Sequence, residues 1–228
     1  MTKWPLTRSQ RLLRDILILL FTLLLLYAAL GFPIPTAGAA LRSMEKRHFF
    51  SGAQVLGQAE HEDGGGRSYA LRRGDWYARA DLHRRRILCF SFWEPGQFYT
   101  AQVQSGSPLT PVLEEDTFFF SGAQEVWVFS DDPSIASVSL EVPVRLSPAL
   151  TRIYRFSQEE KAFGNCFVLT CAPPNISSYS YSREFRLSGY DRSGALVWQS
   201  PLPEEWVKSF GISPETGSVI SQDPTAVP

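Results

Sequence analysis

The chain has 228 residues and a formal net charge of −1, with 22 Lys and Arg residues against 23 Asp and Glu residues. This balance gives no overall attraction to nucleic acid, so we expect no nucleic-acid partner. The three cysteines are an odd and small number, which argues against a fold built on disulfides. After the first 50 residues the chain is long enough for one domain with a substantial core.

An uncharged apolar run extends from Ile16 to Leu30 and, at its widest, to Ile34. A helix over residues 16–34 would be about 28 Å long, close to the roughly 30 Å hydrocarbon core of a bilayer. We therefore expect residues 16–34 to form a transmembrane anchor in contact with the lipid bilayer. Residues 1–15 are then a cytoplasmic basic segment.

Basic residues on the two sides of the run indicate its orientation, because both sides count in the positive-inside rule. Those before the run are Lys3, Arg8, Arg11 and Arg14, and those soon after it are Arg42, Lys46 and Arg47. The first group is larger and lies against the apolar edge. We expect a single-pass cell-membrane protein whose C-terminal domain is extracytoplasmic.

A signal peptide is the alternative interpretation of the same run. Ala37-Gly38-Ala39 offers small residues at the spacing of a cleavage site, and cleavage near Ala39 would produce a secreted protein. The leucine density of the run and the long segment before it favour a retained anchor.

Residues 35–50 predict a linker helix that leads away from the membrane. Thr36 is a suitable N-cap, and Leu41, Met44 and His48 recur at helical spacing.

From residue 51 to residue 211 the sequence changes to short strands separated by Gly and Pro turns. Hairpin turns are predicted at Arg73-Gly74-Asp75, Glu94-Pro95-Gly96 and Tyr190-Asp191-Arg192-Ser193-Gly194. The strands expected are 68–72, 76–80, 86–93, 97–103, 117–120, 124–130, 134–142, 151–156, 166–170, 182–190 and 195–199. This pattern predicts a mainly β chain, with an antiparallel β-sandwich or barrel-like domain and short peripheral helices.

The end of the domain has helix signals. Pro203 suits a first helical turn and Gly211 a C-terminal cap, so one short helix is expected between them. The Pro/Ser/Thr-rich residues 212–228 are expected to be a disordered tail.

Alternation is clearest between Ser137 and Val142. Apolar residues at every second position indicate one buried face of a strand. We expect Val138, Leu140 and Val142 to point into the core and Ser137, Ser139 and Glu141 to face solvent, with the side of Ile135 left open.

Cys166 and Cys171 are five residues apart. In a strand this odd spacing points the two thiols to opposite faces, whereas a turn would allow a small loop disulfide. The disulfide state of both and of Cys89 stays open. No Cys or His spacing typical of a metal site is present, so no metal and no cofactor are expected.

A compact basic run, His83-Arg84-Arg85-Arg86, lies between predicted strands. In a loop, Arg84, Arg85 and Arg86 would raise the local positive potential and could hold phosphate groups of lipids or an anionic envelope polymer. They are the candidate binding residues, while no residue is assigned a catalytic role.

Three further segments accompany the apolar run: Leu41 to Arg47, Asp131 to Val138, and Tyr190 to Trp198. Together the chain resembles uncharacterised single-pass membrane-anchored proteins of Gram-positive bacteria. The resemblance implies a bacterial cell-surface location, no known activity and no functional residue.

The first functional hypothesis is a membrane-anchored extracytoplasmic β-rich module that binds a protein or envelope polymer, or supports assembly of an envelope complex. The alternative is a cell-envelope hydrolase, which would need two carboxylates roughly 5–9.5 Å apart.

Overall fold

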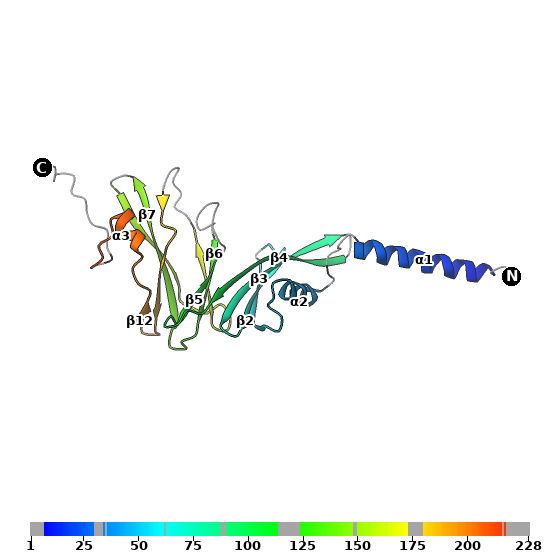
Figure 1. Cartoon of the computed structure of the whole chain (residues 1–228), viewed down its shortest axis with the longest axis horizontal. Helices are drawn as coiled ribbons and strands as arrows, with labels where there is room; N and C mark the ends of the chain where they lie inside the picture. The colour runs from blue at the N-terminus through cyan, green and yellow to red at the C-terminus, as the bar shows by residue number, and fades with distance from the viewer. Residues whose placement is uncertain are drawn as a thin grey trace.

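The computed structural model describes residues 7–29, 34, 36–61, 63–87, 90–113, 124–147, 150–172, 180–215 and 217. This part of the chain is mainly β, with antiparallel sheets and few helices, which confirms the predicted fold class at that level. The helix α1 extends from one end, and the β layers follow one another away from it (Figure 1).

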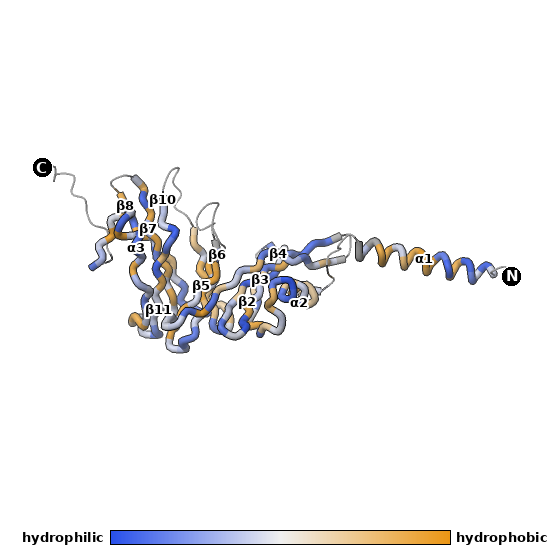
Figure 2. Tube along the Cα trace, viewed as in Figure 1, coloured by the Kyte–Doolittle hydropathy of each residue, from blue (hydrophilic) through white to orange (hydrophobic). Residues whose placement is uncertain are grey.

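The first helix, α1 (Arg8–Ala29), stands apart from the β layers. Its apolar part lies towards the domain (Figure 2), and its large apolar side chains are exposed. Among the described residues, no helix is both long and apolar enough to cross a membrane. The expected anchor at residues 16–34 is therefore not confirmed: charged residues occupy the first turns of α1, and residues 30–33 lie outside the described range.

The segment expected to form a linker helix contains the helix α2 (Ala37–Arg47). The Thr36 hydroxyl accepts a hydrogen bond from the Ala39 amide, as an N-cap does. Ala40, Leu41 and Met44 are buried against the first sheet, so α2 covers one face of that sheet.

The first sheet has the strand order β1-β2-β3-β4, and each neighbouring pair is antiparallel. Its strands are β1 (Gln54–Glu60), β2 (Gly66–Arg73), β3 (Trp76–Ile87) and β4 (Phe90–Gln102). Arg73 pairs with Trp76 across the turn, and Gly74 has a φ of 58°, which a residue without a Cβ adopts freely. The predicted Arg73-Gly74-Asp75 hairpin is confirmed.

The prediction of a turn at Glu94-Pro95-Gly96 is wrong, because β4 continues through these residues. The chain reverses instead between Ile87 and Phe90, across residues outside the described range. Pro95 lies opposite Leu82 beside a register shift, where a bulge tolerates a residue that cannot donate a ladder hydrogen bond.

The other two sheets are also antiparallel. The second has the order β5-β6-β9, from β5 (Leu109–Val112), β6 (Gln124–Ser130) and β9 (Cys166–Cys171). The third has the order β10-β7-β11-β12, with β8 also paired to β7. Its strands are β7 (Ser137–Ser147), β8 (Leu150–Gln158), β10 (Ser180–Tyr181), β11 (Arg186–Tyr190) and β12 (Leu196–Gln199).

The second sheet is buried on both faces. Val126, Val128 and Leu169 pack towards the third sheet, whereas Trp127 and Phe129 pack towards Tyr77 of the first sheet. The strands of the middle sheet therefore contribute to two layers of apolar contacts, one on each face of that sheet.

The short helix expected after Pro203 is α3 (Glu204–Phe210). It ends at Gly211, whose φ of 64° is the left-handed C-terminal cap that the sequence indicated. The indole of Trp206 donates to the Glu184 carbonyl at 2.9 Å, which fixes α3 on the third sheet. Most of the expected tail at residues 212–228 lies outside the described range.

The burial of side chains along β7 agrees with the prediction on one face of the strand and differs on the other. Val138, Leu140 and Val142 are buried, as expected, and Ile135 is buried too. Ser139 and Glu141 are also buried, so their expected exposure to solvent is wrong. The reason is that β8 and β11 flank β7 on its two edges, and their side chains cover its second face.

Candidate functional site

The basic run lies in a strand, not in the loop that the sequence predicted. Residues 84–87 of β3 pair with residues 90–93 of β4 and form a two-stranded extension of the first sheet, here called the β3–β4 arm. Ile34, five residues after the end of α1, is hydrogen-bonded to Trp93 through both backbone groups, at 2.9 and 2.8 Å. The arm is therefore attached to the segment that leads from α1.

Strand geometry separates the three predicted binding residues, since side chains alternate between the faces of a strand. Arg84 and Arg86 share the face of Trp93 and Ser91, their partners on β4. Arg85 lies on the opposite face, where its Nε is 2.7 Å from a carboxylate oxygen of Glu94. The three arginines are therefore not one cluster.

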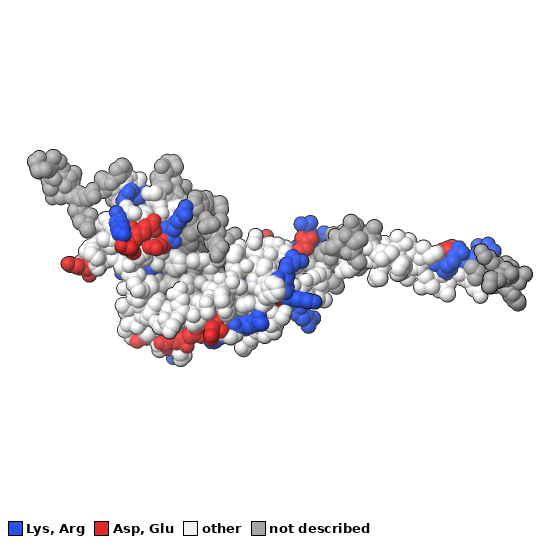
Figure 3. Space-filling model, in the orientation of Figure 1, with Lys and Arg blue, Asp and Glu red and all other residues white. Residues whose placement is uncertain are grey.

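Arg84 and Arg86 instead meet Arg67 of β2 at a pocket of about 430 Å³. Its remaining lining residues are Glu60, Asp63, Gly64, Gly65, Gly66 and Trp93. The guanidinium carbons of Arg67 and Arg84 lie 5.4 and 6.0 Å from the centre of a Trp93 ring, within cation–π range. On the face drawn in Figure 3, Lys and Arg side chains gather over the part of the domain nearest α1.

The charges in the pocket are not fully compensated. Arg67 donates to one carboxylate oxygen of Glu60 at 2.6 and 3.0 Å. Arg84 donates to the Ser91 hydroxyl at 3.1 Å. Within the described part of the chain, neither Arg84 nor Arg86 forms an ion pair with a carboxylate.

The backbone amides of Gly64 and Gly65 already have hydrogen-bond partners within the loop. The Gly64 amide donates to the His61 carbonyl at 2.8 Å, and the Gly65 amide donates to the Asp63 carboxylate at 2.7 Å. The Gly65 carbonyl accepts from the Arg84 amide at 2.7 Å and so holds the loop against β3. The positive potential of the pocket therefore comes from arginine side chains.

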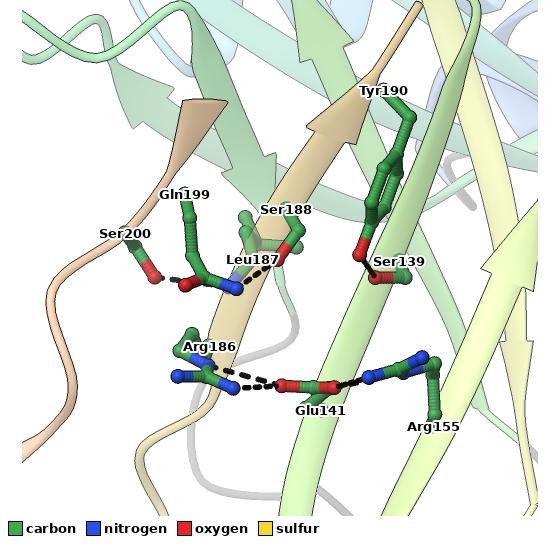
Figure 4. A network of polar contacts seen from close by, with 9 residues as sticks. All are labelled: Ser139, Glu141, Arg155, Arg186, Leu187, Ser188, Tyr190, Gln199 and Ser200. Carbon is green, nitrogen blue, oxygen red and sulfur yellow. Dashed lines mark hydrogen bonds and ion pairs between the residues drawn. The ribbon is translucent and has the colours of Figure 1, made fainter. Parts of the chain in front are cut away.

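A second polar cluster covers the outer face of the third sheet (Figure 4). Glu141 of β7 lies between Arg155 of β8 and Arg186 of β11, and its side chain is only 3% exposed. Arg186 donates to one carboxylate oxygen at 2.7 and 3.0 Å, and Arg155 donates to the other. Burial alone would raise the pKa of Glu141, but the hydrogen bonds from Arg186 and Arg155 outweigh it and lower the pKa.

The rest of that cluster is hydrogen-bonded within itself. The side-chain amide of Gln199 donates to the Ser188 hydroxyl at 2.8 Å, and the backbone amide of Leu187 donates to the Ser200 hydroxyl at 3.0 Å. Together with the bonds to Glu141, these bonds join β7, β8, β11 and β12 across their shared face (Figure 4). We interpret this cluster as a structural clamp.

A chain of hydrogen bonds joins half-buried His61, which follows β1, to buried Ser68 of β2 and buried Asp81 of β3. The Ser68 hydroxyl donates to Asp81 at 2.5 Å, and His61 Nε2 lies 2.9 Å from the same hydroxyl. In a nucleophilic triad the histidine lies between serine and carboxylate, whereas here the serine is in the middle. Ser68 is also 1% exposed, so the order and the burial both argue against a nucleophile.

The hydrolase alternative is not favoured by the carboxylates of the pocket. Glu60 and Asp63 line the same space, but Glu60 accepts hydrogen bonds from Arg67 and Asp63 accepts one from Gly65. A glycosidase acts through a general acid and a second carboxylate that both face the substrate, whereas each of these groups already accepts hydrogen bonds within the protein. Among the described residues, no group of three or more His, Cys, Asp and Glu side chains is arranged to hold a metal ion.

Cys166 and Cys171 are both buried free thiols on opposite faces of β9, as their spacing in a strand predicted. Burial raises the pKa of Cys171 to about 12 and also raises the pKa of Cys166. Both thiols are therefore unsuited to nucleophilic chemistry. Cys89 lies outside the described range.

Sequence reasoning located Arg84 and Arg86 but missed Arg67, Trp93 and the Gly64–Gly66 loop. These residues come from β2, β4 and the turn before β2, and only the register of the sheet brings them together. The three consecutive glycines were the one feature of the local sequence that indicated a close approach of the backbone to a neighbouring group.

The fold and the pocket together define a β-rich domain with a basic arm next to an exposed apolar helix. The family model described as a domain of unknown function (DUF5044) matches residues 33–210, and the chain belongs to this family. The match begins beside the Ile34–Trp93 bridge and ends at the last residue of α3, so it includes the arm and all three sheets. No curated protein and no solved structure matches the chain.

Proposed function

We propose that this chain is a membrane-anchored, extracytoplasmic β-rich module that acts in binding or in the assembly of an envelope complex. The observation that carries the proposal is the exposed surface of α1. Its large apolar side chains between Leu12 and Tyr27 that the structure describes are 42–65% exposed. Exposed apolar surface of this extent is costly in water, and a bilayer would cover it.

The length of α1 sets a condition on this proposal. From Ile16 to Ala29 the helix measures about 21 Å, less than the roughly 30 Å hydrocarbon core. The crossing therefore requires the apolar sequence of residues 30–34 as well, or a local thinning of the bilayer.

The start of the folded domain favours retention of the anchor over cleavage near Ala39. Cleavage there would remove Thr36, which caps α2, and would separate Ile34 from its bridge to Trp93. It would also leave the new N-terminus at Ala40, within α2, where the residue is 0% exposed against the first sheet. These contacts support a protein that keeps its N-terminal segment.

The anchor is tested by membrane extraction. We expect the full-length chain to remain with membranes after high-salt and alkaline washes. Leu20→Arg combined with Leu24→Arg should release it, because each arginine at the centre of a span costs about 2.5–3.5 kcal/mol. Leu196→Arg, at an exposed leucine of β12, is the matched control and should stay membrane-bound. A mature N-terminus at Ala40, found by mass spectrometry, would support the secreted alternative instead.

The orientation is tested on intact cells that carry a C-terminal tag on this chain. External protease should remove the tag while a cytoplasmic reporter stays whole, since the larger basic group precedes the apolar run. If the tag survives while a known surface protein is cut, the domain faces the cytoplasm.

A further inference from the structure

We propose that the pocket between the Gly64–Gly66 loop and the β3–β4 arm binds the phosphate group of an anionic lipid headgroup at the membrane surface. The lipid source rests on the proposed anchoring of α1, whereas the affinity for an anion rests on the pocket itself. This assigns Arg84 and Arg86 as binding residues and leaves Arg85 outside the site.

The first argument is the charge of the pocket. Arg67, Arg84 and Arg86 supply three positive charges, and Glu60 is already engaged by Arg67. Arg84 and Arg86 therefore retain guanidinium donors for a ligand. Planar guanidinium groups match the oxygens of a phosphate in bidentate geometry, which an ammonium group cannot do.

The second argument is the indole of Trp93. Arg67 and Arg84 both lie over this residue, at 5.4 and 6.0 Å from ring centres. The stacking limits the freedom of two long side chains before any ligand binds, so less entropy is lost on binding. Tryptophan is also the side chain most typical of the polar boundary of a bilayer.

The third argument is position. Trp93 is hydrogen-bonded to Ile34, five residues beyond Ala29. Five residues span at most about 18 Å even when fully extended, so the pocket wall lies within that distance of the end of α1. With α1 in the bilayer, the pocket is then held near the headgroup layer.

The fourth argument concerns the two carboxylates. Glu60 and Asp63 line the same pocket and would repel a small polyanion such as inorganic phosphate. They would instead accept hydrogen bonds from hydroxyl groups of a headgroup. The pocket volume of about 430 Å³ is of the size that accommodates a small ligand. The lining therefore favours a phosphodiester with a hydroxylated headgroup.

The test uses the full chain in neutral detergent micelles, so that anchoring does not decide the result. It is titrated with dihexanoylphosphatidylglycerol, with dihexanoylphosphatidylcholine and with inorganic phosphate. We expect binding of the phosphatidylglycerol only. Arg84→Gln combined with Arg86→Gln should weaken it by roughly 25-fold, at roughly fivefold for each basic residue.

Arg85→Gln is the matched control for each single substitution, since it removes one positive charge from the same strand on the face away from the pocket. Its affinity should stay within about twofold of the parent, because Glu94 already compensates this charge. Thermal unfolding of the double variant shows whether the arm is still folded. Wild-type-like unfolding together with lost binding supports the proposal.

Three results would overturn it. A loss of roughly fivefold from Arg85→Gln, the same per charge as in the double variant, would indicate diffuse attraction and no pocket. Equal binding of the phosphatidylcholine would exclude recognition of the anionic headgroup, and equal binding of inorganic phosphate would make free phosphate the ligand. Release from membranes on alkaline washing contradicts the anchor alone, because the micelle titration still decides whether the pocket binds.

Discussion

Replacing Glu141 by Ala should lower the free energy of unfolding by about 3–5 kcal/mol, the range for removing one partner of a buried ion pair. Arg186 is only 16% exposed, and its charge is compensated by Glu141. Without the carboxylate, that guanidinium is left in a poorly hydrated place with its donors unpaired. Urea denaturation of the full chain in a neutral detergent measures the loss.

Glu204→Ala is the control for this prediction. Glu204 forms an ion pair with Lys208 one helical turn away, and both side chains are largely exposed. Exposed pairs of this kind contribute about 0.3–0.5 kcal/mol, so the control should lose no more than that. If both variants lost equally little, Glu141 would not act as a buried counter-charge.

The stability contributed by Glu141 should also depend on pH. Its pKa is lower in the folded protein than the ordinary value of 4.5, so the unfolded chain takes up a proton first as the pH falls. The contribution is therefore complete above the ordinary pKa and is lost as the pH drops through the folded pKa. Glu141→Gln, which cannot titrate, should lack this part of the acid destabilisation.

Residues 137–142 show why the strands were easier to predict than their surroundings. Alternation located β7 and the buried side of Val138, Leu140 and Val142, because a strand repeats every two residues. It assigned Glu141 to solvent, because a single strand carries no information about its neighbours. The two arginines that compensate the charge of buried Glu141 come from β8 and β11. They lie 14 and 45 residues after Glu141 in the chain.

Turn prediction failed where two signals competed. Glu94-Pro95-Gly96 has turn composition, yet the apolar residues on both sides continue one long strand. Pro95 pairs with Leu82 next to a bulge in the register, and the ladder continues on both sides of it. The basic run was expected in a loop for another reason: the strand predicted at 76–80 continues to Ile87. The sequence could therefore indicate the basic residues but not which of them share a face.

Trp127→Ala is expected to be as destabilising as Glu141→Ala, at about 3–5 kcal/mol, the usual range for a tryptophan removed from a core. Its side chain, 1% exposed, projects from β6 of the middle sheet into the layer shared with the first sheet. One face of the indole meets Arg79 at 5.0 Å, and Phe163 lies 5.1 Å from it. Truncation of Trp127 to alanine leaves a cavity in the layer between the first and second sheets.

This position determines which amides should lose protection. Hydrogen exchange of the Trp127→Ala variant should speed up most in β2, β3 and β6, whereas β7 and β8 keep the separate core around Leu140. Trp76→Ala is the control, since Trp76 is 42% exposed beside the Gly74 turn and should cost far less. Uniform loss of protection across all three sheets would show that they unfold as one unit. In that case the folding of the β3–β4 arm would depend on the polar cluster around Glu141. Glu141→Ala and Trp127→Ala would then weaken headgroup binding to the same extent.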